Sequence, residues 1–125
     1  MTLRRALAVP ALLLALVLGL GACADSPAAA DADPVTAGTV VLDVRTPDEF
    51  AEGHLAGAVN IDVQAADFAA RAAELPTDAP VVVYCRSGNR SAAAVTVLRD
   101  LGFTDLTDAG AMTDAAASLG LEIVS

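Results

Sequence analysis

One cysteine with two arginines close behind it is the feature of this 125-residue chain most suited to chemistry. Cys85 follows the apolar run 81–84, and Arg86 and Arg90 lie within five residues of it. The run is continuous and rich in β-branched side chains, which predicts a buried strand. A cysteine at the carboxyl end of such a strand, facing the start of a helix, lies where α/β proteins usually place reactive groups.

The loop from Cys85 to Arg90 has the means to activate this thiol. An ordinary cysteine has a pKa of about 8.5, so only about 3% is thiolate at pH 7. Gly88 permits a backbone twist that turns N–H groups toward the sulfur, and Ser91 is expected to cap a helix whose positive end points inward. The helix dipole contributes about 0.3–1 kcal/mol, whereas lowering the pKa by two units needs about 2.7 kcal/mol. The N–H groups and an arginine must therefore add to it, and the two arginines also suit a small oxyanion.

Strands that alternate with helices predict the fold class, a small α/β domain whose mainly parallel sheet is flanked by helices. Thr46 is expected to cap a helix with Pro47 in its first position. We expect strands over 39–44, 58–61, 81–84, 104–106 and 121–124, and further helices over 67–75, 91–101 and 112–119.

The beginning of the chain has the features of an export signal. Two arginines precede the apolar run 6–20, which is shorter than the roughly 18–20 residues that a membrane span needs. The run ends in Leu-Gly-Ala-Cys, which resembles a bacterial lipobox in which Cys23 carries the lipid; an ordinary secretory signal and an uncleaved anchor are the alternatives. We therefore expect a protein anchored at Cys23 to the extracytoplasmic face of the bacterial cell membrane. The expected division is a signal peptide over 1–22, a flexible tether over 23–38 and one domain over 39–125.

Charge and cysteine count exclude several functions. All 16 acidic residues but only five of the seven basic ones follow Cys23, so the net charge of that part is −11, which argues against a nucleic-acid partner. If Cys23 carries lipid, Cys85 has no partner for a disulfide within the chain. With one histidine and no cluster of metal-ligand spacing, we predict no metal and no cofactor, and we expect a monomer.

Two blocks of the sequence resemble the single-domain rhodanese-like family. They are "VVLDVRTPDEFAEGHLAGAVNI" at 40–61 and "VVVYCRSGNRSAAAVTVLRDLGF" at 81–103. The resemblance implies that Cys85 is a nucleophile that takes sulfane sulfur as a persulfide, and that the loop after it cradles an anion. The chain departs from the family pattern in having no tryptophan and a short segment before Val40, which concerns packing at the ends of the domain rather than the loop.

This resemblance implies a sulfurtransferase of the thiosulfate sulfurtransferase type, which moves sulfur from thiosulfate or polysulfide to cyanide or a thiol. Cysteine phosphatases use a Cys-x5-Arg loop, whereas Cys85 and Arg90 have the Cys-x4-Arg spacing that accompanies sulfur transfer in the family. The alternative is a non-catalytic module that binds a partner or senses redox state. The residues expected to bind the anionic donor are Arg86, Ser87, Gly88, Asn89 and Arg90.

The remaining candidates are expected to support the loop or the fold. Asp43 ends a predicted strand near Cys85 and could hydrogen-bond to the loop, and Ser91 lies directly behind it. Arg45 and Glu49 have the spacing of an ion pair along one helix face. His54 is expected to hold a turn rather than to act on Cys85.

Overall fold

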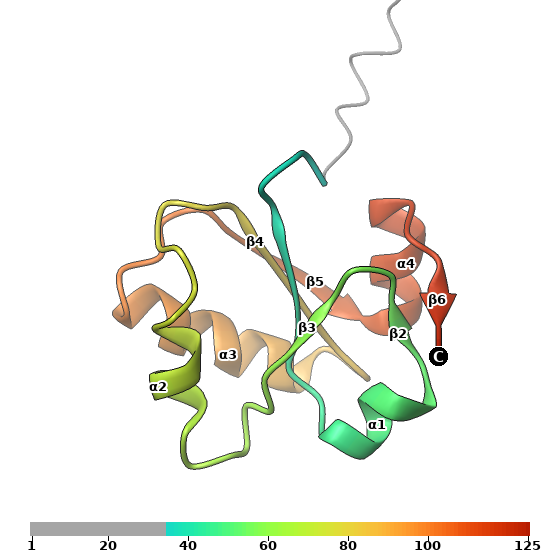
Figure 1. Cartoon of the computed structure of the whole chain (residues 1–125), viewed down its shortest axis with the longest axis horizontal. Coiled ribbons are helices and arrows are strands. Elements are labelled where there is room, and N and C mark those ends of the chain that lie inside the picture. Colours follow the sequence, from blue (N-terminus) through green and yellow to red (C-terminus); the bar gives the residue numbers. More distant parts are fainter. Residues whose placement is uncertain (1–34) are drawn as a thin grey trace, which may run out of the picture.

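The computed structural model describes residues 35–125, and these form a parallel sheet with helices on both faces (Figure 1). The strands of this sheet lie in the order β3-β1-β4-β5, and every pairing between them is parallel. The predicted fold class, a small α/β domain with a mainly parallel sheet, is confirmed. The strands are β1 (Val40–Asp43), β3 (Val59–Asn60), β4 (Val81–Cys85) and β5 (Leu106–Ala111).

The helices connect these strands, and two of them follow the prediction closely. In α1 the Thr46 hydroxyl accepts the Glu49 N–H while the Glu49 carboxylate accepts the Thr46 N–H, which is a capping box with Pro47 in the first turn. The fourth helix has the predicted bounds, and the third begins two residues earlier than predicted. The helices are α1 (Pro47–Glu52), α2 (Phe68–Ala72), α3 (Asn89–Asp100) and α4 (Met112–Leu119).

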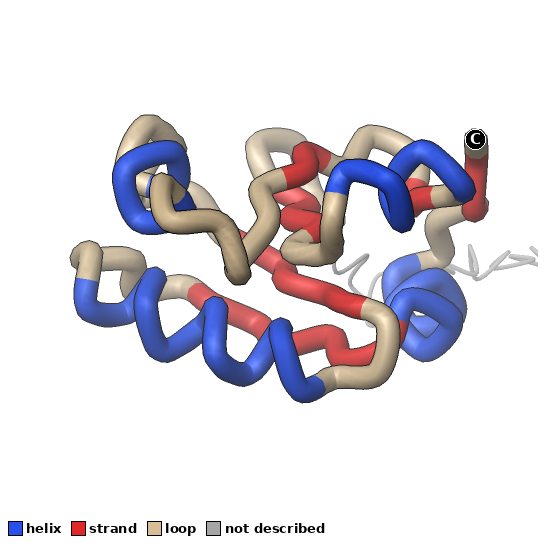
Figure 2. The backbone as a smooth tube through the Cα atoms, turned by 90° about the horizontal axis from the view of Figure 1, so that it is seen from below, coloured by secondary structure: helices blue, strands red, loops and turns tan. Residues whose placement is uncertain are grey.

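β4 is a central strand whose five residues are all buried. Val83 and Cys85 belong to the apolar cluster that contains residues of α2 and α3, whereas Val82 and Tyr84 belong to the cluster that contains residues of α4. Figure 2 shows the long helix α3 running along the strands. Because side chains alternate across a strand and both faces are covered, β4 has no solvent-facing side and can be apolar throughout.

The strands near the carboxyl end differ from the prediction. The sequence predicts a strand over 104–106, but β5 extends to Ala111. β5 includes Asp, Ala and Gly, which strands disfavour. The length of β5 is therefore decided by its pairing with β4. The last strand, β6 (Ile123–Val124), does not join the parallel sheet. It pairs antiparallel with β2 (His54–Leu55), which the sequence did not predict because two residues carry no periodicity.

Residues 1–34 lie outside the described residues; they include the predicted signal peptide, Cys23 and most of the predicted tether. The described end of that tether forms a turn in which Thr36 O accepts the Thr39 N–H at 3.0 Å, and Val35 packs against the α4 cluster. Within residues 35–125 no helix is long and apolar enough to cross a membrane.

Candidate active site

The thiol of Cys85 lies at the carboxyl end of β4, inside the turn that leads into α3. Cys85 is fully buried and its thiol is free. Only residues 86–88 separate β4 from α3. Gly88 has a φ of +99°, in the left-handed region that glycine adopts without strain, and its N–H lies 2.9 Å from Cys85 Sγ. The backbone of this short loop therefore turns back on the sulfur.

The prediction that Ser91 caps α3 is wrong. The helix begins at Asn89 with Gly88 as its N-cap, and no side chain caps it. The left-handed turn at Gly88 brings the chain into the helix two residues before the expected cap. Ser91 is buried in the first turn, where its hydroxyl donates to Gly88 O at 2.9 Å. Ser91 therefore follows the loop directly, as the sequence predicts, but it belongs to the helix and is not its cap.

Hydrogen bonds lower the pKa of Cys85. Burial alone raises the pKa of this thiol, because the thiolate would lose its hydration. Hydrogen bonds from Ser91, and from the backbone N–H groups of Gly88 and Ser87, favour the thiolate and outweigh burial. The Ser91 hydroxyl can rotate its proton from Gly88 O toward the sulfur when the thiolate forms. A larger fraction of Cys85 is therefore thiolate at neutral pH than in an ordinary cysteine.

The two arginines of the predicted loop have different environments. Arg90 donates from Nη1 to Glu49 Oε2 at 2.7 Å and from Nη2 to Glu49 Oε1 at 2.9 Å, which joins α3 to α1. The hydrogen bonds from Arg90 lower the pKa of Glu49 to about 2. Arg86 is exposed, and its side chain makes no hydrogen bond or ion pair with another residue of the described part of the chain. An anion can therefore reach Arg86 without displacing a partner, whereas Arg90 already has one.

The predicted ion pair between Arg45 and Glu49 is wrong. Arg45 Nη2 lies 2.7 Å from Asp43 Oδ2 and 2.6 Å from Gly53 O, and Nε donates to both Asp43 oxygens at 3.1 Å. The side chains of this pair are 5% and 0% exposed. Arg45 precedes α1 and lies in the interior, so the spacing to Glu49 along a helix face does not apply.

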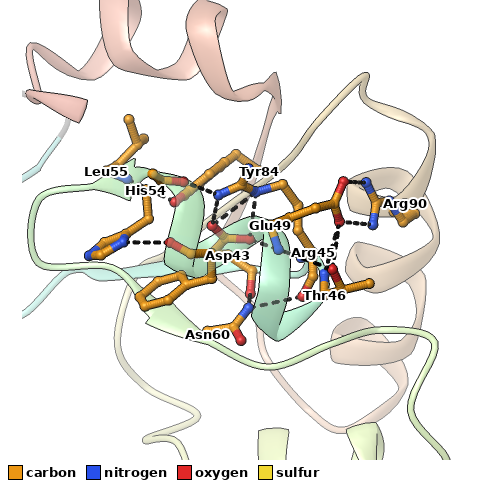
Figure 3. A network of polar contacts seen from close by, with 11 residues as sticks. Asp43, Arg45, Thr46, Glu49, His54, Leu55, Asn60, Tyr84 and Arg90 are labelled. Carbon is orange, nitrogen blue, oxygen red and sulfur yellow. Dashed lines mark hydrogen bonds and ion pairs between the residues drawn. The ribbon is translucent and has the colours of Figure 1, made fainter. Parts of the chain in front are cut away.

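The prediction that Asp43 hydrogen-bonds to the loop is wrong for residues 35–125, because its carboxylate pairs with Arg45 instead. Its side-chain contacts within residues 35–125 are to Arg45 and Tyr84, and none is to residues 86–90. Tyr84, which precedes Cys85, accepts the Leu55 N–H at 3.0 Å, and its ring centroid lies 5.8 Å from the Arg45 guanidinium carbon. Figure 3 shows this network between the end of β1, α1 and β4.

His54 holds the turn after α1, as the sequence predicts. Its ring stacks on Phe50 with 3.7 Å between the centroids, and its Nδ1 lies 2.9 Å from Phe50 O. The ring is therefore engaged with α1, and no contact with Cys85 is among the interactions of the described residues.

A pocket of about 290 Å³ opens beside the loop. Its lining comes from the segment between β1 and α1, from α1 and the turn after it, and from the loop, α4 and β6, namely Arg45, Glu49, Glu52, Gly53, Arg86, Met112 and Ile123. Of these residues, the sequence predicts only Arg86 as part of the site. The others come from residues 45–53 and from Met112 and Ile123, which are far from one another and from Arg86 in the chain, so no local pattern links the three parts of the lining. Among residues 35–125 no group of three or more His, Cys, Asp or Glu could hold a metal ion.

Comparison with known families and proteins identifies close similarity to sulfurtransferases. Residues 26–109 match the family model of the rhodanese-like domain. The thiosulfate sulfurtransferase GlpE of Pseudomonas fluorescens strain SBW25 is 47% identical over 70 residues, which is 55% of this chain and 62% of that protein. The thiosulfate sulfurtransferase PspE of Escherichia coli K12 is 32% identical over 83 residues, which is 66% of this chain and 80% of that protein. The chain thus spans less than two thirds of GlpE but most of PspE.

Solved structures agree with this similarity. A rhodanese with anions from E. coli matches with a TM-score of 0.59 and 29% identity, over 70% of this chain and 98% of that one. A rhodanese-related protein from Thermoplasma volcanium matches with a TM-score of 0.58 and 33% identity, over 70% of this chain and 84% of that one. The predicted rhodanese-like fold is therefore confirmed.

Proposed function

The chain belongs to the rhodanese-like domain family, and on this premise we propose that it is a sulfurtransferase in which Cys85 carries the sulfur as a persulfide. The observation that supports this most directly is the hydrogen bonding of the buried Cys85 sulfur to the turn before α3, which lowers the pKa of the thiol. The relatives named thiosulfate sulfurtransferase are 47% identical over 70 residues and 32% identical over 83 residues, and they support thiosulfate as a donor.

In the first half-reaction the Cys85 thiolate attacks the outer sulfur of thiosulfate. A bond forms between Cys85 Sγ and that sulfur, the sulfur–sulfur bond of thiosulfate breaks, and sulfite leaves with the electron pair. Arg86, which has no partner within residues 35–125, would bind the donor anion. The N–H groups of Ser87 and Gly88, with Asn89 at the helix start, would hold the charge of the incoming sulfur.

Arg90 has a different part in this proposal from the one that the sequence suggested. Because both terminal nitrogens of Arg90 bind Glu49, its guanidinium would position the first turn of α3 rather than meet the donor. Its charge still favours the Cys85 thiolate, since the two groups interact electrostatically.

In the second half-reaction an external thiol or cyanide takes the outer sulfur and releases the Cys85 thiolate. Cys85 is the one cysteine among residues 35–125, so no second thiol there can resolve the persulfide. The persulfide enzyme would therefore wait for an acceptor, which predicts ping-pong kinetics.

Intact mass of the purified protein after incubation with thiosulfate tests the proposal. We expect a gain of about 32 Da, the mass of one sulfur atom, which cyanide removes with release of thiocyanate. Cys85→Ser should show no gain. If neither thiosulfate nor polysulfide adds sulfur to a thiol shown to be free, the enzyme proposal fails and a binding or redox-sensing module remains.

We also propose that Cys23 carries a lipid and that the domain acts outside the cytoplasm of a bacterium. The support is the sequence Leu-Gly-Ala-Cys that ends the apolar run 6–20. Incorporation of labelled fatty acid by the full chain, and its loss in Cys23→Ala, would test this. Incorporation that persists in Cys23→Ala would contradict it.

A further inference from the structure

We propose that the pocket beside the loop binds the sulfur acceptor, and that this acceptor is a thiol with an amino-acid headgroup. Its ammonium group would bind Glu52 and its carboxylate would bind Arg86, both of which line the pocket. The inference rests on the proposed sulfurtransferase function and adds the chemical class of the acceptor.

The charges that remain unpaired in the pocket lead to this headgroup. Four charged side chains line it, and two of them already have partners elsewhere: Arg45 binds Asp43, and Glu49 binds Arg90. The other two, Glu52 and Arg86, are exposed and make no side-chain hydrogen bond or ion pair with any residue of 35–125. One free carboxylate and one free guanidinium match a ligand that carries one charge of each sign.

Thiosulfate, which Arg86 would also bind in the first half-reaction, gains less from this pocket than a zwitterion does. Thiosulfate carries two negative charges, so it would gain from Arg86 but would be repelled by Glu52 and would find Arg45 neutralised by Asp43. A zwitterion pairs with both free groups and leaves no charge without a partner.

The apolar part of the lining and the size of the pocket restrict the rest of the ligand. Met112 and Ile123 add an apolar wall, and Ile123 is 47% exposed, so a methylene group placed there would cover apolar surface. A volume of about 290 Å³ lies at the lower end of the range for ligand pockets, about 300–1,000 Å³. The pocket therefore suits a small thiol.

The position of Arg86 relates this headgroup to the transfer step. Arg86 lines the pocket and directly follows Cys85 in the chain, so a carboxylate bound to Arg86 would hold the ligand next to the loop that carries the persulfide. The acceptor thiolate forms a bond to the outer sulfur of the Cys85 persulfide. The bond between that sulfur and Cys85 Sγ breaks, and its electron pair returns to Cys85 as the thiolate. The product is the acceptor persulfide, and no oxidant or reductant is consumed.

The test isolates the second half-reaction. The protein is loaded with sulfur from thiosulfate or polysulfide, freed of the donor, and mixed with one acceptor; quenched samples are then followed by intact mass. The acceptors are L-cysteine, cysteamine (without the carboxylate) and 3-mercaptopropionate (without the ammonium). The rate constant of each variant is divided by that of the wild type for the same acceptor, so that differences in intrinsic thiol reactivity cancel. Rates refer to the loaded fraction only.

Glu52→Gln should slow transfer to L-cysteine and cysteamine by up to about fivefold, the range of exposed ion pairs, and should leave 3-mercaptopropionate unchanged or faster. Arg86→Gln should slow L-cysteine and 3-mercaptopropionate but not cysteamine. Glu74→Gln, the same change at an exposed residue outside the pocket, should affect none of them. Glutathione carries the same headgroup in its γ-glutamyl residue. If Glu52→Gln slows transfer to glutathione more than transfer to L-cysteine, the amino-acid headgroup that the pocket binds is that of the tripeptide.

Equal effects of Glu52→Gln on all three acceptors, or no effect on any, would overturn the inference while persulfide loading stands. Absence of loading in the wild type would overturn the proposed function and this inference together. Thermal melts of each variant confirm that the protein remains folded.

Discussion

Replacement of the buried carboxylate of Asp43 by an amide tests how a buried ion pair stabilises the domain around β4, the strand that ends in Cys85. Asp43→Asn keeps the shape of the side chain but removes the charge that compensates Arg45, whose side chain is 5% exposed. Removing one partner of a buried ion pair typically costs about 3–5 kcal/mol, because the other charge is left without compensation in the interior. A domain of this size has a free energy of unfolding of only about 5–15 kcal/mol, so the loss should be large.

The matched control is Glu49→Gln, the same chemical change in an ion pair whose side chains are 20% and 22% exposed. Water can replace the lost contacts there, and glutamine can still close the capping box with Thr46. We therefore expect a smaller loss than in Asp43→Asn. Urea unfolding at pH 7, followed by circular dichroism, measures both. Equal losses in Asp43→Asn and Glu49→Gln would refute the reasoning that burial decides the cost.

Four further predictions follow from single contacts. Alkylation of Cys85 against pH should show a lower midpoint in the folded protein than in the protein unfolded by urea, and an equal or higher midpoint would contradict the effect of the hydrogen bonds on the thiolate. Tyr84→Phe leaves the buried Leu55 N–H without an acceptor and should lower the free energy of unfolding by about 1–3 kcal/mol in urea titrations. The pKa of Glu49 is lowered from 4.5 to about 2, so the ionised carboxylate stabilises the folded state. This contribution to the free energy of unfolding should be complete above about pH 4.5 and should disappear as the pH falls toward 2. Free energies of unfolding of the wild type and Glu49→Gln, measured by urea titration, should therefore converge over that range. Gly88→Ala places a side chain on a residue in the left-handed region, and should lower the free energy of unfolding by about 1–2 kcal/mol and slow the alkylation of Cys85; if both values were unchanged, the requirement for glycine at this turn would be wrong.

The sequence alone determined those elements that a local pattern specifies. The apolar run ending at Cys85 has to be a strand covered on both faces, because a solvent-facing side would expose its valines. Thr46 and Pro47 start α1, and the glycine at position 88 supplies the turn before α3, because caps and left-handed turns depend on a few neighbouring residues. The candidate nucleophile and its loop follow from these local signals together with the family resemblance.

Only the tertiary structure decided which charged groups meet. Arg90 and Glu49 are 41 residues apart, and Arg45 is buried with Asp43 rather than lying along the face of α1. The short strands β2 and β6 and the extent of β5 depend likewise on their partners. These features arise when distant segments pack, and ion pairing between them depends on burial and distance rather than on spacing along the chain. The pocket beside the loop, with two charged side chains that have no partner among residues 35–125, is a product of the same packing.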